Sequence, residues 1–517
     1  MPLDDRDKIA HLLRRTGFAA RPEEIEAGVA RGLGATVDSV LNFQSVPDNL
    51  ATLPNDPETN RPYLDLTFEE FRGKQGIFIG EVERLWLNAM ITTTRPLQEK
   101  MVLFWHGLFA TSAQGTADER QIYLQNENFR GNFHPDTGQV VRPTPGGPFP
   151  VGNFHLILEY LTKDPAMLFW LDNALNRRLN NEVGSNENYA RELHELFSMG
   201  VEDVVAKVPN YTEQDIRQAS RALTGWTIRR RSDNFPRTFF FDNSAHDPGP
   251  YTHLGKRGGN NANFIFDNVV SHKNTQQQHS AVGRFLGYRL FKFFGYDDLE
   301  PEIINALAGV FDGVNGGQPY IIANMLRTMF TPGNVVSEAF YSERAFKAHI
   351  KSPTEYIISA FRYLKPDGLG RVQNLIRPVL AGLISMGQYL LFPPDVSGWK
   401  EGLNWINTTF DLARFNFANS FATLPSGQGG ISTDSLRATL TQNGAQTPEQ
   451  VVDYFTSLML QVTVPPEART ALVNYLRAGT DGTPGGFDFD LAENATIDNK
   501  VRSLIHLIMT MPEFQLS

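Results

Sequence analysis

The sequence predicts a mainly α-helical protein: a large multi-helical body with one small β and loop insertion around residues 227–275. Apolar residues recur at helical spacing along most of the 517 residues. Prolines and glycines stand where these helices would begin and end. Residues 227–275 interrupt the pattern with a strand-like run at 238–241 and a glycine-rich remainder. The apolar fraction of 41 % is sufficient for a sizeable core.

In the first half of the chain, helices are expected wherever apolar spacing and capping residues agree. Ile9, Leu12 and Leu13 give residues 5–16 an apolar face, and Gly17 follows. A second helix begins at Pro22, with acidic residues in its first turns, where the helix dipole favours them. Further helices are expected at 81–90, 96–111, 154–171 (broken at 163–165), 186–200 and from Thr212 onward.

Helices return after the insertion, at 281–294, 302–311, 320–329, 353–364 and 372–386. A polar, glycine-rich stretch at 425–435 is interpreted as a linker to the last helices. The expected organisation is a main helical body at 1–424, with a long loop at 130–152 and the insertion at 227–275 within it. Residues 425–517 then form a C-terminal helical segment packed on the body.

Composition excludes several classes of function. The net charge is −10, from 47 basic and 57 acidic side chains, which argues against general nucleic-acid binding. The absence of cysteine removes disulfides, thiolate nucleophiles and zinc–thiolate sites. The polar start resembles no secretory signal, and no apolar stretch is long enough to span a membrane. The cytoplasm is therefore the expected compartment.

One helix carries a pair of carboxylates beside an apolar face. Glu192 and Glu195 are three residues apart within 186–200, so they share one side of the helix. Such a pair can bind a hard cation or act as acid and base. Asn188 stands one turn earlier, and with Arg191 it is a candidate substrate-binding residue. The alternative is that both carboxylates pair with cations on a partly exposed face.

His106 lies in a helix that is apolar nearly all round, so burial is expected. A buried imidazole needs partners for both nitrogens, and a divalent metal held with Glu192 and Glu195 would provide one. A core histidine satisfied by ordinary hydrogen bonds is the alternative. No further signal for a cofactor is present.

Two other candidates lie in loops. His246 and Asp247 follow the strand-like run. A loop histidine beside an acid can be a ligand, a general base or an exposed bystander, and Asp247 could instead form a turn. Trp399 and Trp405 form an aromatic cluster after two prolines. Such rings bind sugars by stacking, but they also wedge loops against a core.

Familiar catalytic signatures are missing. The sequence has no phosphate loop, no dinucleotide-binding glycine motif after a strand, no Gly-x-Ser-x-Gly and no His-Glu-x-x-His. Nucleotide-dependent, ordinary serine-hydrolase and zinc-protease activities are therefore not expected.

A series of short strings occurs in a fixed order along nearly the whole chain. They are AHLLRRTGF at 10–18, EKMVLFWHGLFATS at 99–112, NENYARELHELF at 186–197, ALTGW at 222–226, FD at 241–242, HDPG at 246–249, PPDVSGW at 393–399 and PEFQ at 512–515. Together they resemble the bacterial family catalogued as domain of unknown function 1800. The resemblance implies a helical fold and a site near these motifs, but no substrate.

The resemblance also implies two departures and a partner. Leu108 and Tyr251 stand where the family usually has a second histidine and a lysine, so this member could be altered or inactive. The genes of such proteins often neighbour those of domain of unknown function 1501, which resembles alkaline phosphatases and sulfatases. Relatives often carry export signals, so export together with a signal-bearing partner is conceivable.

Two functions follow as expectations. The first is an enzyme, a hydrolase or lyase, with an acid–base or metal-assisted site at His106, Glu192, Glu195, His246 and Asp247, acting on a polysaccharide or another polar polymer. The second is a non-catalytic assembly or surface protein that works with a partner of the domain of unknown function 1501 family.

Overall fold

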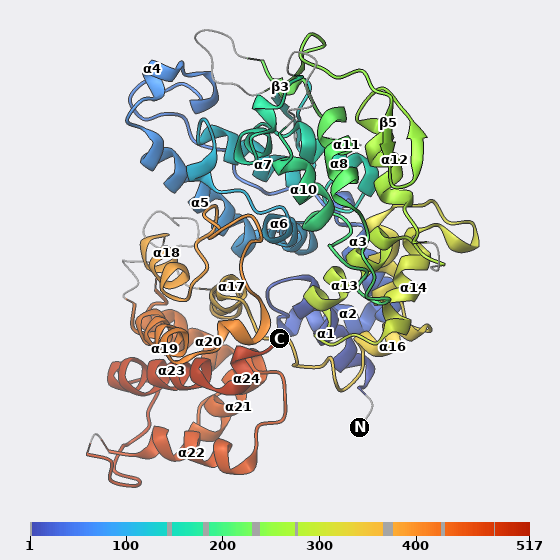
Figure 1. Ribbon diagram of the computed structural model, residues 1–517. Helices are drawn as coiled ribbons and strands as arrows, with labels where there is room; N and C mark the ends of the chain where they lie inside the picture. The colour runs from blue at the N-terminus through green and yellow to red at the C-terminus, as the bar shows by residue number, and fades with distance from the viewer. Residues whose placement is uncertain are drawn as a thin grey trace.

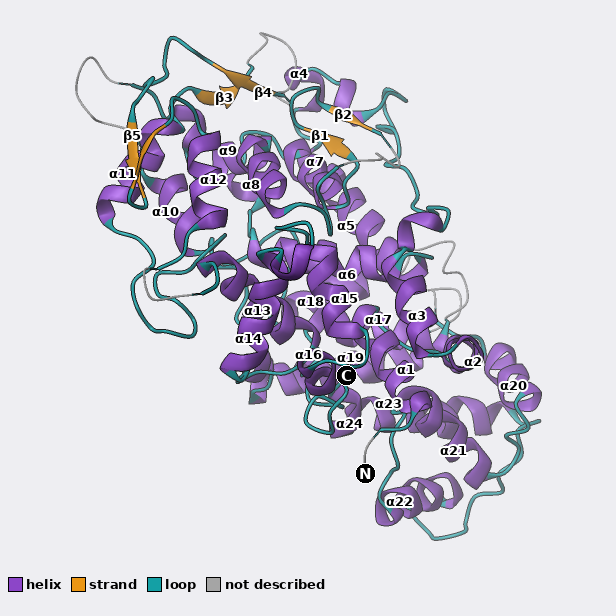
Figure 2. Cartoon of the chain, turned by 90° about the vertical axis from the view of Figure 1, so that its right-hand side faces the viewer, coloured by secondary structure: helices purple, strands orange, loops and turns teal. Residues whose placement is uncertain are grey.

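Helix makes up 57 % of the protein, which confirms the mainly α class. The computed structural model describes residues 3–141, 147–178, 186–229, 238–274, 278–365, 376–424, 430–479 and 481–517. Within these ranges the only sheets are three two-stranded antiparallel hairpins. Figures 1 and 2 both place the strand hairpins at one end of the molecule and α20–α22 at the opposite end.

The N-terminal helices largely follow the expected caps and breaks. The predicted helix at 5–16 has the same bounds, and Asp164 ends α8 while its side chain caps α9. The helices are α1 (Asp5–Thr16), α2 (Pro22–Arg31), α3 (Leu33–Leu41), α4 (Phe68–Phe71), α5 (Gln75–Thr92), α6 (Pro96–Leu108), α7 (Arg120–Phe129), α8 (Phe154–Lys163), α9 (Pro165–Trp170), α10 (Asn188–Glu195) and α11 (Glu213–Ala222).

The insertion around 227–275 holds two of the hairpins and one helix that was not expected. In the long loop at 130–152, β1 (Phe133–His134) pairs with β2 (Gln139–Val140). Further on, β3 (Trp226–Ile228) pairs with β4 (Phe239–Phe241), and β5 (Tyr251–His253) with β6 (Lys256–Gly258). The insertion ends with α12 (Asn263–Ser271), whose apolar side chains are buried.

The second half of the chain is again helical. Its helices are α13 (Ala281–Phe294), α14 (Pro301–Phe311), α15 (Ile322–Phe330), α16 (Val335–Phe340), α17 (Pro353–Leu364), α18 (Ile376–Ser385), α19 (Thr408–Thr423), α20 (Thr433–Gln442), α21 (Pro448–Met459), α22 (Pro466–Arg477), α23 (Arg502–Thr510) and α24 (Pro512–Gln515). Between α18 and α19 lies the 3-10 turn η7 (Gly402–Trp405).

A single apolar cluster runs from Leu12 on α1 to Phe514 on α24. The C-terminal helices join it because α23 packs along α19, and Arg502 donates to the carbonyl oxygens of Ala422 and Ile431 at 3.0 and 2.7 Å. Part of the expected linker, 425–429, lies outside the described residues. The boundary at residue 424 stays a prediction.

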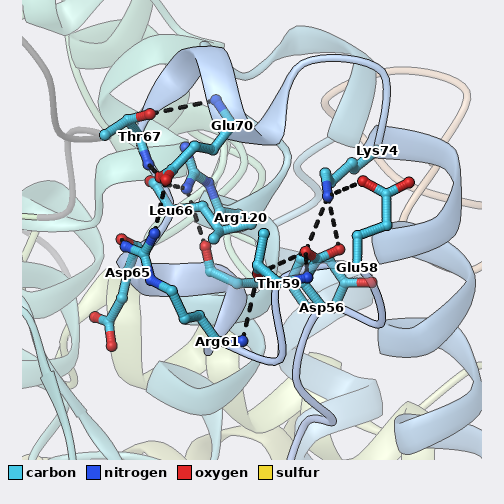
Figure 3. Close-up of polar contacts among 11 residues, drawn as sticks. Asp56, Glu58, Thr59, Arg61, Asp65, Leu66, Thr67, Glu70, Lys74 and Arg120 are labelled. Carbon is cyan, nitrogen blue, oxygen red and sulfur yellow. Dashed lines mark hydrogen bonds and ion pairs between the residues drawn. The ribbon is translucent and has the colours of Figure 1, made fainter.

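The proline-rich connector after α3 is held by two cations, the buried Arg120 and the half-buried Lys74. Arg120 on α7 donates to the carbonyl oxygens of Tyr63 and Leu66 at 3.0 and 2.7 Å (Figure 3). Lys74 binds both carboxylate oxygens of the buried Asp56, at 3.0 and 2.9 Å. The Arg120 bonds fix the connector to α7, and the Lys74 bonds fix its loop at Asp56. The regular structure near these bonds is short, namely the 3-10 turn Tyr63–Asp65 and α4.

Candidate functional site

His106 is a buried histidine of α6 with an ordinary structural role. Its Nε2 accepts a hydrogen bond from the backbone N–H of Leu391 at 3.1 Å. Burial lowers the pKa of His106 to about 3, so the ring is neutral. The ring packs edge-on against Trp86 and beside Trp399, with centroids 5.0 and 5.3 Å apart. His106 therefore stabilises the Trp399 loop through its hydrogen bond to Leu391 and its packing against the Trp399 ring.

Glu192 and Glu195 lie on α10 and are half-buried, as their spacing predicts. Burial and the charge of Glu195 raise the pKa of Glu192. Glu195 accepts a long hydrogen bond from the Tyr211 hydroxyl at 3.4 Å. Arg191 makes two bonds of 2.8 Å to Glu213, which occupies its guanidinium. The exposed Asn188 is the first residue of the helix.

His246 and Asp247 are engaged by the loops around them. The ring nitrogens of His246 face the carbonyl oxygens of Thr224 and Asn260 at 2.8 and 3.2 Å. Asp247 forms a two-pronged ion pair with Arg221 at 2.8 and 3.1 Å. Burial raises the pKa of Asp247, but the bonds from Arg221 and from the backbone N–H of Gly249, together with the charges of Arg221 and Arg178, bring it below its usual value. Both side chains thus hold the loop onto α11.

The structure does not bring these predicted groups together. In the described part of the chain no hydrogen bond or ion pair joins His106, the α10 carboxylates and the His246–Asp247 loop to one another. No three His, Asp or Glu side chains among the described residues are grouped so that they could hold a metal ion. The proposed metal site of His106, Glu192 and Glu195 is therefore not formed. A catalytic role of Glu192, Glu195, His246 or Asp247 stays a prediction.

Trp399 and Trp405, in contrast, line one pocket. Its volume is about 220 Å³. Its walls come from α6, the end of α13, the segment before α17 and the loop that ends in η7. The lining residues are Leu103, Phe104, Gly107, Lys292, Phe293, Tyr296, Asp297, Ala348, His349, Ile350, Ser352, Glu355, Gln388, Trp399, Glu401, Gly402, Leu403 and Trp405.

A close backbone approach sets the position of Trp399. Gly398 has φ of 76° and lies on the carbonyl of Gly107 in α6, where an added Cβ would collide with that oxygen. Only glycine tolerates both conditions. The loop therefore closes onto α6 and turns Trp399 toward the pocket.

The floor of the pocket holds a buried carboxylate shared by a lysine and a histidine. Glu355, in the first turn of α17, forms an ion pair with Lys100 of α6. Its other oxygen, Oε2, accepts from Nε2 of His349 at 2.9 Å and from the backbone N–H of Ser352 at 2.8 Å. Burial raises the pKa of Glu355, but His349 and Lys100 together outweigh this effect and hold the pKa well below its usual range. Glu355 is thus ionised and fixed on both sides.

These bonds determine the state of His349. Because Nε2–H is donated to Glu355, the other ring nitrogen, Nδ1, carries the lone pair in the neutral ring. Burial lowers the pKa of His349, Glu355 opposes this, and Arg15 adds to the lowering. The ring is therefore unprotonated at neutral pH. A neutral histidine oriented by a carboxylate is suited to act as a general base.

Sequence reasoning missed both residues. The one visible signal was the Ser352–Glu355 spacing, which is that of a capping box, and the structure shows that box. A capping box is by itself a complete structural explanation for a glutamate at this position. Its bonds to His349 and Lys100 depend on the tertiary fold.

Comparison with known proteins identifies a family and nothing finer. The family model described as "Protein of unknown function (DUF1800)" matches residues 11–516. The chain belongs to this family. No curated protein and no solved structure matches it. Among the described residues of this DUF1800 member, no helix is long and apolar enough to cross a membrane.

The two residues that depart from the DUF1800 pattern, Leu108 and Tyr251, both make structural contacts. Leu108 is the last residue of α6 and is buried in the apolar core. The Tyr251 hydroxyl donates to the carbonyl oxygen of Asp247 and lies 3.3 Å from Nε2 of His246. Tyr251 therefore closes the His246–Asp247 loop by hydrogen bonding.

Proposed function

We propose that the protein is an enzyme that carries out an acid–base step on a polar ligand held between Trp399 and His349. The observation that carries the proposal is the chain of bonds from Lys100 through Glu355 to His349, which ends at a pocket walled by Trp399 and Trp405. This keeps the expected acid–base chemistry and the two tryptophans as substrate-binding residues. It moves the base from the α10 carboxylates to His349.

The proposed step is a proton transfer. Nδ1 of His349 takes a proton from a hydroxyl group of the ligand, or from a water molecule beside it. The resulting imidazolium keeps its Nε2–H bond to Glu355, whose negative charge stabilises it. Since the ion pair with Lys100 fixes the carboxylate, the ring stays oriented through the step.

The residues that line the pocket indicate the class of ligand. Indole rings stack on the apolar faces of sugars, and the carboxylates of Asp297 and Glu401 at the mouth can accept bonds from hydroxyl groups. We therefore propose a carbohydrate substrate, such as a polysaccharide end, for a hydrolase or lyase reaction. The cytoplasm remains the proposed compartment.

The test compares His349→Asn with wild type on a panel of soluble polysaccharides, measuring release of reducing ends or of unsaturated products. Loss of a general base is expected to lower the rate about 100- to 10,000-fold. Melting and circular dichroism should show a folded protein, because the asparagine amide can still donate a hydrogen bond toward Glu355. His134→Asn, at the exposed β1–β2 hairpin, is the matched control. Wild-type rates in the His349 variant would refute the proposal.

A second function has an observation in its favour. Four large apolar side chains are exposed on neighbouring elements, Ile384 of α18, Leu403 of η7, and Leu412 and Phe415 of α19. Exposed apolar groups in one region are typical of protein contacts. We therefore keep assembly with a partner of the domain of unknown function 1501 family as the alternative. Co-purification of the two proteins, lost when Leu412 and Phe415 are changed to Ser, would support it.

A further inference from the structure

The pocket is charge-balanced at both its mouth and its floor. At the mouth, Lys292 lies 3.8 Å from Asp297 and 4.0 Å from Glu401. Arg289 lies 4.0 Å from Glu401, so two cations face two carboxylates there. At the floor, Lys100 neutralises Glu355, and the nearby Arg15, which lowers the pKa of His349, is bonded to the carbonyl oxygens of Phe294 and Gly295. A ligand that brought its own charge would meet no surplus of the opposite sign, and it would lose hydration on entry.

The polar groups that face the pocket offer both donors and acceptors. Oε1 of Gln388 accepts from the backbone N–H and hydroxyl of Thr354 at 2.9 and 2.8 Å, which leaves its amide N–H groups as donors. Oγ of Ser352 accepts from the Glu355 N–H at 3.3 Å, which leaves its own proton to donate. His349 presents an acceptor at Nδ1. Alcohol groups match such a mixed set, because each of them donates and accepts.

The size of the pocket limits the ligand further. Pockets for drug-sized molecules typically measure about 300 to 1,000 Å³. This pocket, at about 220 Å³, is smaller, and its lining includes the aromatic residues Phe104, Phe293, Tyr296, Trp399 and Trp405. One sugar ring satisfies both conditions, and an enclosed oligosaccharide would exceed the volume.

We infer that the pocket takes a single uncharged pyranose ring, bound by its apolar face against Trp399 and Trp405, with one hydroxyl group at Nδ1 of His349. The inference rests on the proposed function for the role of His349, but it concerns recognition and can be tested by binding alone. It names neutral hexoses at the end of a chain as the ligand class. Uronic acids and amino sugars are disfavoured by their charges.

The experiment is calorimetry and tryptophan fluorescence on the full chain with methyl glucoside, methyl galactoside and methyl mannoside, each compared with glucuronate and glucosamine. At least one neutral glycoside should bind at least about tenfold more tightly than either charged sugar. Trp399→Ala should weaken that binding about tenfold or more, which is the loss of one stacking contact. Trp399→Phe should restore part of it. Trp170→Phe, at a half-buried tryptophan outside the pocket, is the matched control.

The outcomes separate recognition from catalysis. The inference is overturned if a charged sugar binds more tightly than every neutral glycoside, if no neutral glycoside binds, or if Trp399→Ala binds like wild type. His349→Asn should lose turnover far more than it loses binding of the neutral glycoside, because it removes the base but only one of the hydrogen bonds to the sugar. If wild type binds a neutral sugar but does not turn it over, the proposed enzymatic function is refuted, whereas the inference about sugar binding is supported. If wild type turns over another substrate but binds no neutral sugar, the inference about sugar binding is refuted, whereas enzymatic activity is supported.

Discussion

The Nε2 atoms of His194 and His253 lie 2.8 Å apart, where α10 meets β5 in the core. Nδ1 of His194 lies 2.7 Å from the carbonyl oxygen of Ala190, so this nitrogen must donate. In the neutral ring, Nε2 of His194 is then the acceptor, and Nε2–H of His253 donates to it. Nδ1 of His253 is left as a buried acceptor without a hydrogen-bond partner among the described residues. The pair is thus built for two neutral rings.

Stability should therefore fall on acidification. Burial lowers the pKa of His194 to about 4, whereas an unfolded histidine takes up its proton near about 6.5. Between these values the unfolded state binds more protons, so the free energy of unfolding decreases as pH falls through this window. His194 alone should contribute on the order of 1–3 kcal/mol. Urea unfolding at several pH values between about 7 and about 4.5 measures this.

The variant His194→Gln isolates the effect. Its amide oxygen can still accept from His253, but it cannot titrate, so the decline in stability with acid should become shallower. His134→Gln at the exposed hairpin is the control for the same chemical change. An unchanged pH dependence in His194→Gln would show that the pair is not the source.

Local signals were sufficient for most of the fold. Caps and prolines in the sequence marked α1, the break between α8 and α9, and the capping box of α11. The expected helix at 186–200 is shorter, because after Glu195 the backbone N–H of Phe197 bonds back to the Glu192 carbonyl. Helix α12 was missed because the glycine-rich residues before it led us to interpret the whole of 227–275 as loop and strand.

The site was only half predictable. Trp399 and Trp405 stand in a recognisable aromatic cluster, and the structure places both at one pocket. His349 and Glu355 carry no such pattern, since Lys100, the partner of Glu355, lies 255 residues earlier in the chain. His106, Glu192 and Glu195 are residue types that suit a metal or acid–base site, but the fold does not group them at one place. Residue type indicates chemistry, whereas convergence is a tertiary property.

Glu83 should make the protein less stable as pH rises toward neutrality. This residue of α5 is buried, and burial raises its pKa to about 7, with the Tyr389 hydroxyl opposing. The folded state therefore holds the proton more tightly than the unfolded state, and the stability this gives is lost as pH rises from about 4.3 through 7. At about pH 8 the free energy of unfolding of Glu83→Gln should exceed that of wild type by on the order of 1–3 kcal/mol. At about pH 5 the two proteins should differ little.

Chemical denaturation of both proteins at the two pH values measures the difference. Glu81→Gln is the control on the same helix, because Glu81 pairs with Arg84 at a partly exposed position. A Glu83→Gln variant that is less stable than wild type at both pH values would contradict the prediction. It would mean that the carboxylate is compensated in its charged form.

Removal of Lys100 should destabilise the protein strongly. Lys100→Met leaves the carboxylate of Glu355 buried without its ammonium partner, which typically costs about 3–5 kcal/mol. Adding Glu355→Gln removes the unpaired charge, so the double variant should be more stable than Lys100→Met alone. This non-additivity is measured by a double-mutant cycle of urea unfolding. Arg469→Met, which breaks the exposed pair with Asp453, should cause no measurable change. Additive effects at Lys100 and Glu355 would contradict the buried pair.

His106 should control both stability and the Trp399 loop. Leu391 has a left-handed backbone with φ of 66°, and its N–H is satisfied by Nε2 of His106. His106→Leu leaves that buried N–H without an acceptor, at a cost of about 1–3 kcal/mol. His106→Gln keeps an acceptor in nearly the same place and should retain more of the stability.

Because the His106 ring also packs on Trp399, the Leu variant should shift tryptophan emission, and urea unfolding with fluorescence measures both quantities. A Leu variant with wild-type stability and emission would mean that Leu391 has found another acceptor, and that the position of Trp399 is set by Gly398 alone.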